Sequence, residues 1–185
     1  YLRKHWSGKK ASAPTLEKKH HKYFLRFTYV EEVSLNQTPV KEQTICSVDL
    51  GINTDAVCTI MRPDGTILGR KFINFPSDKD RMYRVLGRIR RFQREHGSRQ
   101  VQGKWAYAKR LNTELGRKIA REIVLYASEK KADVIVFEYL EMKGKLSGKK
   151  KQKLQMWRKC DIQKRCGQQA HRKGIRISRI CAWNI

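Results

Sequence analysis

The sequence lacks any apolar run close to the roughly 20 residues that a membrane-spanning helix needs, and no signal peptide opens it. Acidic residues are scarce, with 17 Asp and Glu against 42 Lys and Arg, a formal net charge of +25 over 185 residues. The five cysteines form no Cys-x-x-Cys pair and have no His at ligand spacing. We therefore expect neither a membrane partner nor a zinc–thiolate site in these residues, and a reducing intracellular compartment.

The excess positive charge is concentrated in two segments. Residues 139–185 contain 14 Lys or Arg and 2 acidic residues, and residues 78–118 contain 13 and 4. An excess of this size is more than solubility requires and indicates a polyanionic partner. Both segments also carry apolar periodicity, which a solvated basic tail lacks. We expect nucleic acid as the partner, in preference to a membrane surface or an acidic protein.

A polar connector at residues 31–43 divides the chain. Before it, residues 1–20 are basic and polar, with loops expected at Ser7-Gly8 and Ala11-Ser-Ala-Pro14. Residues 21–30, rich in aromatic and branched side chains, predict one strand, with or without a bend. After it, the pattern predicts strands at 44–50, 56–61 and 66–75, a helix at 79–94, a basic loop at 95–104 and a helix at 113–131. A strand at 134–138, a helix at 154–173 and a strand at 175–180 are expected to follow. Ser77 or Asp78 is the expected cap of the first helix, and Gly174 is expected to end the last.

The first of these helices separates apolar from basic side chains. Its apolar face carries Met82, Val85, Leu86, Ile89 and Phe92, and its opposite face carries Arg81, Arg84, Arg88, Arg91 and Arg94. Arginine with almost no intervening acid suits phosphate better than solvation, because a guanidinium forms a bidentate fork. We expect these arginines to contact a nucleic-acid backbone, and weaker single assignments extend the contacts to Lys149, Lys150, Lys151, Arg172 and Lys173.

Two of the predicted strands deliver a carboxylate at their ends. Asp49 ends the first strand after the connector, and Glu138 ends the fourth. Three antiparallel strands followed by alternating helices and strands are the layout of the ribonuclease H-like α/β fold, in which the first and fourth strands of a mixed sheet lie side by side. That fold would bring both carboxylates together, as two Mg²⁺ ions about 3.5–4 Å apart require.

Each carboxylate also has an ordinary structural explanation. Asp49 could cap the turn into Gly51, Glu138 could be the solvent end of a strand, and Asp55 and Asp133 are expected to be turn and strand-start residues. An actin-like ATPase also places Asp-x-Gly after a first strand, but it needs a second glycine-rich phosphate loop, and none follows Glu138. An unpaired carboxylate at a buried strand is costly, so the two acids together favour a metal site.

Several motifs together resemble the RuvC-like nuclease domain of the insertion-sequence TnpB proteins, relatives of the compact type V CRISPR effector nucleases. They are Val48-Asp-Leu-Gly-Ile52, Val134-Ile-Val-Phe-Glu138-Tyr-Leu140, Trp157, Ile162-Gln-Lys-Arg165 and Ala170-His-Arg-Lys-Gly-Ile175 through Ala182-Trp-Asn184. The resemblance implies two domains: residues 1–43, the end of a β-rich wedge domain with its linker, and residues 44–185, a truncated RuvC-like domain.

The resemblance also implies an RNA-guided DNA endonuclease of the prokaryotic cytoplasm. Asp49 and Glu138 would be its first two catalytic and metal-binding carboxylates, with two Mg²⁺ ions in the complete site and guide RNA and target DNA as partners. The family pattern continues past Asn184 with a four-cysteine zinc ribbon, which alone would bind Zn²⁺, and with a third catalytic Asp. This sequence ends before both, and Ile185 stands where the family has Thr.

We therefore expect a piece of a larger protein that cannot cleave alone and needs further chain, a second polypeptide or a second copy. A cleavage-inactive RNA-guided DNA-binding protein, a split subunit and an RNA-binding domain of ribosomal type stay open as alternatives.

Overall fold

The structure is a computed structural model that describes residues 10–97, 101–139 and 158–181. The chain forms two compact units, Tyr1–Ser34 and Leu35–Ile185. The division falls after Ser34, within the polar connector expected at residues 31–43, and the rest of this connector belongs to the second unit. The assignment of the first unit to a wedge domain stays a prediction.

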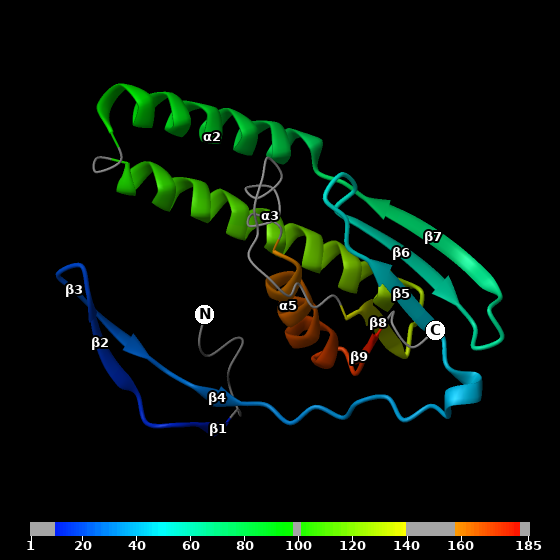
Figure 1. The fold of residues 1–185 in the computed structure, drawn as a ribbon. Coiled ribbons are helices and arrows are strands. Elements are labelled where there is room, and N and C mark those ends of the chain that lie inside the picture. Colours follow the sequence, from blue (N-terminus) through cyan, green and yellow to red (C-terminus); the bar gives the residue numbers. More distant parts are fainter. Residues whose placement is uncertain (1–9, 98–100, 140–157, 182–185) are drawn as a thin grey trace. The chain divides into compact units, whose positions relative to one another are not determined.

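The first unit consists of two small antiparallel ribbons. Its strands are β1 (Lys10–Ala11), β2 (Thr15–Lys19), β3 (Lys22–Arg26) and β4 (Tyr29–Val30). β1 pairs with β4, and β2 pairs with β3 through a turn at His20 and His21, both at positive φ (Figure 1). Residues 12–14 form the expected loop, and Ser7 and Gly8 lie outside the described residues. β2 was not predicted, and the strand expected over 21–30 is interrupted after Arg26, so it forms β3 and β4. The lysines of β2 hide its alternation of apolar and polar residues. Pairing with β3, which places Leu16 opposite Leu25, makes this segment a strand.

The second unit is built on a five-stranded mixed sheet in the order β7-β6-β5-β8-β9. Its strands are β5 (Ile45–Asp49), β6 (Ala56–Met61), β7 (Ile67–Ile73), β8 (Val134–Glu138) and β9 (Arg176–Ile180), and a short 3₁₀ helix, Val40–Glu42, precedes them. β5, β6 and β7 form the predicted antiparallel meander, whereas β8 is parallel to both β5 and β9. The predicted α/β fold, with the first and fourth strands of the sheet as neighbours, is confirmed.

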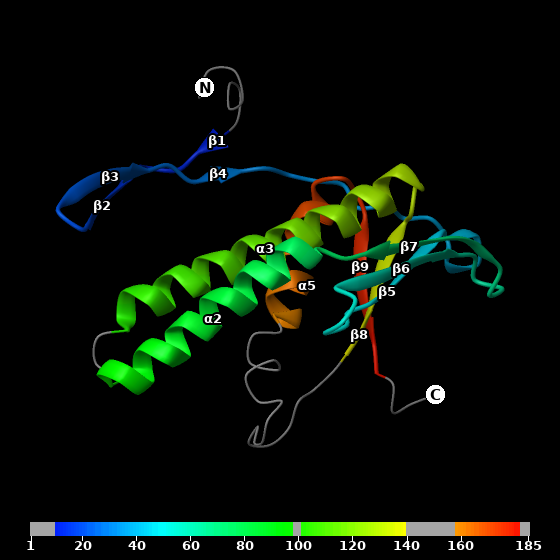
Figure 2. The same ribbon diagram turned by 90° about the horizontal axis from the view of Figure 1, so that it is seen from above.

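One face of this sheet forms the core. Alternate residues of the central strands are buried, and they pack against the helices α3 (Gln102–Glu129) and α5 (Lys159–His171) (Figures 1 and 2). The largest fully buried side chains there are Phe137, Ile60, Ile123 and Ile135. Removing this apolar surface from water is the main stabilising term of the unit. Cys46 and Cys58 lie buried in the same core.

The helix α2 (Pro76–His96) packs antiparallel against α3, and Figures 1 and 2 show the pair extending away from the sheet. The predicted start of α3 and the predicted cap of α2 are wrong. α3 begins at Gln102, although residues 95–104 were expected to form a loop and the helix was expected from Thr113. Phe75 is the N-cap of α2 and Pro76 occupies its first turn, so neither Ser77 nor Asp78 is the cap.

The early start of α3 comes from tertiary packing. Ala108 and Leu111 join Met82, Leu86 and Ile89 of α2 in a second apolar cluster, separate from the sheet core. This cluster stabilises a helical turn whose own sequence, with Gly103 and several lysines, gives a weak signal. The last helix begins at Lys159, after the expected start, and residues 154–157 lie outside the described residues. Gly174 ends it at positive φ, as predicted.

Asp133 fixes the start of the two central strands. Its buried carboxylate accepts hydrogen bonds from the Thr44 backbone N–H at 2.7 Å, from the Thr38 hydroxyl at 2.8 Å and from the Asn36 side-chain amide. Its own backbone N–H donates to the Thr44 carbonyl at 2.8 Å. As predicted, Asp133 is a strand-start residue, and these contacts set the register of β5 against β8.

Replacing Asp133 by Ala should lower the free energy of unfolding by at least about 2 kcal/mol, because buried donors then lose a charged acceptor. Urea denaturation followed by circular dichroism measures this change. Glu129→Ala, at an exposed acid near the end of α3, should leave the midpoint unchanged. Equal midpoints for the two variants would contradict the anchoring role of Asp133.

Candidate metal centre and nucleic-acid interface

Asp49 and Glu138 occupy the ends of neighbouring parallel strands. The ladder between β5 and β8 pairs Ile45 with Val134 and Val48 with Phe137, so both strands end one residue later, at the two acids. Side chains alternate between the faces of a strand. Since Val48 and Phe137 are buried against the helices, Asp49 and Glu138 share the opposite face.

The two carboxylates have suitable surroundings for a metal ion. Neighbouring strands are about 4.8 Å apart, so side chains on one face can reach a common ion. Asp49 is exposed and Glu138 partly exposed, and within the described residues no ion pair or side-chain hydrogen bond engages either carboxylate. Their oxygens are the hard ligands that Mg²⁺ prefers. Among the same residues, no group of three or more His, Cys, Asp or Glu side chains has metal-holding geometry.

The turn after β5 determines where the strand ends. A Cβ atom at Gly51 would lie 2.6 Å from the Thr54 carbonyl oxygen, so only glycine fits there without a backbone shift. Asp55, at the far side of this turn, accepts a hydrogen bond from the Phe75 N–H at 2.8 Å and pairs with Lys79 at 3.1 Å. Asp55 is thus a structural turn residue, as predicted, and it ties the turn to the start of α2.

The five predicted phosphate-binding arginines lie along the exposed side of α2. Arg81 donates a hydrogen bond to the Tyr107 hydroxyl of α3 at 2.7 Å. Within the described residues, Arg84, Arg88, Arg91 and Arg94 form no ion pair with an acidic side chain. Their guanidinium groups can therefore face a polyanion without first breaking an internal pair. Whether they contact nucleic acid stays a prediction.

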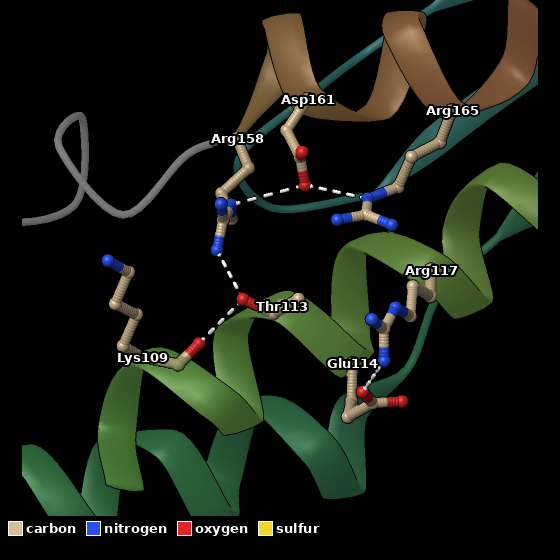
Figure 3. A network of polar contacts seen from close by, with 7 residues as sticks. All are labelled: Lys109, Thr113, Glu114, Arg117, Arg158, Asp161 and Arg165. Carbon is tan, nitrogen blue, oxygen red and sulfur yellow. Dashed lines mark hydrogen bonds and ion pairs between the residues drawn. The ribbon is translucent and has the colours of Figure 1, made fainter. Parts of the chain in front are cut away.

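The arginines of α5 have different surroundings. Asp161, in the first turn of α5, accepts a hydrogen bond from Arg165 at 2.9 Å and lies 3.4 Å from Arg158 (Figure 3). Arg158 also donates to the Thr113 hydroxyl at 2.6 Å, and that hydroxyl donates to the Lys109 carbonyl at 2.8 Å. The Arg158–Thr113 bond clamps α5 onto α3, and Asp161 holds Arg158 in place for it. Arg165 pairs with Asp161 within α5, so both arginines have structural partners.

The remaining predicted basic residues fall into two groups. Arg172 and Lys173 are exposed just after α5, and the Lys173 ammonium donates to the Ser128 hydroxyl at 3.3 Å. Lys149, Lys150 and Lys151 lie outside the described residues. Sequence reasoning missed Lys104 and Tyr107, which contact Phe92 and Arg81 of α2, and Arg110, which lies beside Tyr107, because residues 102–112 were not expected to be helical.

No protein-family model and no curated protein matches the sequence. Solved structures do match its fold. One is a cryo-EM structure of a Cas12f1–sgRNA–target DNA complex, with a TM-score of 0.59 and 17% identity, covering 90% of this chain and 41% of that chain. Another is a CRISPR-Cas12f ternary complex, with a TM-score of 0.55 and 17% identity, covering 91% of this chain and 34% of that chain.

The predicted resemblance to type V CRISPR effectors is confirmed as a resemblance of fold. At 17% identity it extends no further, and this chain spans less than half the length of either matched chain. Among the described residues, no helix combines the length and the apolar character that crossing a bilayer requires.

The α3–α5 clamp should make stability depend on pH. The hydrogen bond from Arg165, with the charges of Arg158 and Arg117, holds the pKa of Asp161 below its ordinary value of 3.8. A lowered folded pKa stabilises the fold above the unfolded value, and this contribution disappears as the pH falls through the folded pKa. Asp161→Asn should therefore reduce the urea midpoint at neutral pH and flatten its decline toward about pH 3.

Glu129→Gln is the control for this measurement, since it removes an exposed acid from α3 and should retain the wild-type pH profile. A wild-type midpoint and an unchanged pH profile for Asp161→Asn would show that the clamp contributes nothing.

Proposed function

We propose that this chain is part of an RNA-guided, Mg²⁺-dependent DNA endonuclease of the TnpB and type V effector kind. The observation that carries the proposal is the parallel pairing of β5 with β8, which places Asp49 and Glu138 side by side on one face of the sheet. The fold match to two Cas12f complexes supports it, because one of them is a complex of Cas12f1 with sgRNA and target DNA.

Asp49 and Glu138 are the residues that would hold Mg²⁺. When bound, the ion would supply a Lewis acid that stabilises charge on the scissile phosphate and lowers the pKa of a water molecule. The contribution of the chain is to fix both carboxylates on rigid strands. The Gly51 turn ends β5 at Asp49, and the Asp133 contacts keep β5 in register with β8.

The charge distribution of α2 supports a nucleic-acid backbone as the second ligand. Its exposed arginines would follow the phosphates of the guide RNA or of the guide–target duplex, recognising shape and charge. Base pairing by the RNA would then select the DNA sequence. The resemblance supports the prokaryotic cytoplasm as the location of this activity.

The test is DNA cleavage by the ribonucleoprotein that contains this chain, with guide RNA, matching DNA and Mg²⁺. Asp49→Ala and Glu138→Ala should each lower the cleavage rate at least about a hundredfold, since even outer-sphere changes at metal sites cost about 10- to 100-fold. Binding of the guide RNA should not change, because neither residue lies on the arginine face of α2.

Glu129→Ala provides the matched control, because it removes an exposed carboxylate without touching the sheet and should cleave at the wild-type rate. Undiminished cleavage by either the Asp49 or the Glu138 variant would refute the catalytic assignment. Loss of RNA binding by these variants would point to a folding defect. It would refute the assignment of metal binding to the two carboxylates and of RNA binding to the arginines of α2.

A further inference from the structure

A cavity of about 460 Å³ is lined by residues of α2 and α3. The end of the helix pair to which these residues belong lies away from the sheet (Figures 1 and 2). α2 contributes Arg88, Arg91, Phe92 and Glu95 to its lining, and α3 contributes Lys104 and Tyr107. The volume lies within the range of about 300–1,000 Å³ that is usual for small-ligand sites. The cavity is separate from the carboxylate pair, which lies on the sheet.

Its aromatic side chains are already arranged beside cations. The Lys104 ammonium lies 4.3 Å from the centre of the Phe92 ring, on the neighbouring helix. The guanidinium groups of Arg81 and Arg110 lie 5.9 and 5.8 Å from the centre of the Tyr107 ring. Each ring thus combines an apolar face with nearby positive charge, which is the combination that binds a base and its phosphate.

The charged residues of the lining favour an anionic ligand that also carries a hydrogen-bond donor. Arg88, Arg91 and Lys104 supply three cations, against the single carboxylate of Glu95, which lies 3.9 Å from the His96 imidazole. Cations at the rim suit the phosphates of a nucleotide, and the carboxylate suits a ring or exocyclic N–H of a base.

We propose that this cavity binds one unstacked nucleotide of a single-stranded segment, its base against Phe92 and Tyr107 and its phosphates on Arg88, Arg91 and Lys104. The proposal rests on the proposed function and deepens it. Arginines that only follow a duplex need no aromatic cavity, because duplex bases are stacked on one another. An unpaired nucleotide uses both features, as in single-strand recognition by stacking on aromatic side chains.

Gly103 provides a clean way to fill the cavity. It lines the cavity, belongs to α3, and a Cβ atom there would meet no atom within 4 Å. Gly103→Leu should place its side chain in the cavity, and replacing a helical glycine should preserve or raise the stability of α3. Gly103→Ala has the same helical benefit with little filling, so it is the matched control.

The experiment uses the 185-residue chain with single-stranded oligouridylate probes of about ten nucleotides that carry one 2-aminopurine, in ribose and deoxyribose forms. Stacking on an aromatic ring quenches 2-aminopurine fluorescence. The wild type and Gly103→Ala should quench the probe. Gly103→Leu should lose the quenching and bind about tenfold more weakly, the expected loss of one stacked base.

Salt dependence separates this proposal from the proposed function. Arg84→Ala, on α2 outside the cavity, should reduce the slope of log affinity against log salt by about 0.7 and keep the quenching. Gly103→Leu should keep the slope. Quenching of the RNA probe alone would assign the cavity to guide RNA, and quenching of the DNA probe alone would assign it to a DNA strand.

Salt-dependent binding without quenching by the wild type would overturn the cavity proposal and leave the proposed function standing. Wild-type affinity and quenching in a folded Gly103→Leu variant, verified by its urea midpoint, would overturn it as well. Absence of salt-dependent binding to either probe would overturn both proposals.

Discussion

The parallel pairing of β5 with β8 is the interaction on which the remaining structure depends. It joins segments that are about 85 residues apart in sequence, and the helix pair α2–α3 forms the excursion between them. Asp133 holds the two strand starts together, and the ladder carries that register forward to Asp49 and Glu138. A slip of one residue would send one carboxylate to the helix-covered face, so the candidate site depends on this register.

The few acidic residues are used selectively. Asp55, Asp133 and Asp161 accept hydrogen bonds or pair with cations that fix a turn, a strand start and a helix start. Asp49 and Glu138 have no such contacts among the described residues. The basic residues divide in the same way. Arg158 bonds to Thr113 of α3 and Arg165 pairs with Asp161 within α5, whereas most arginines of α2 are exposed. Structural and functional charges are thus distinguished by their partners more than by their residue type.

Sequence predicted the parts of the fold in which local pattern and tertiary contact agree. The strands of the sheet either alternate apolar and polar residues or consist of a buried apolar run, so their positions could be inferred. The neighbouring strand ends that carry Asp49 and Glu138 could be inferred in the same way. Residues 102–112 could not, because Ala108 and Leu111 gain their helix from packing on α2. The cavity with Lys104 and Tyr107 depends on that same packing, and no local signal marks it. β2 was missed because its pairing with β3, more than its own lysine-rich pattern, makes it a strand.

The central claim is that Asp49 and Glu138 form one site for a divalent cation. Carbon-detected NMR of side-chain carboxyl groups during a Mg²⁺ titration of the 185-residue chain tests it most directly. The account predicts that the Asp49 and Glu138 signals shift together along one binding curve, while the Glu129 signal does not move. Unchanged signals, or two curves with different midpoints, would contradict a shared site.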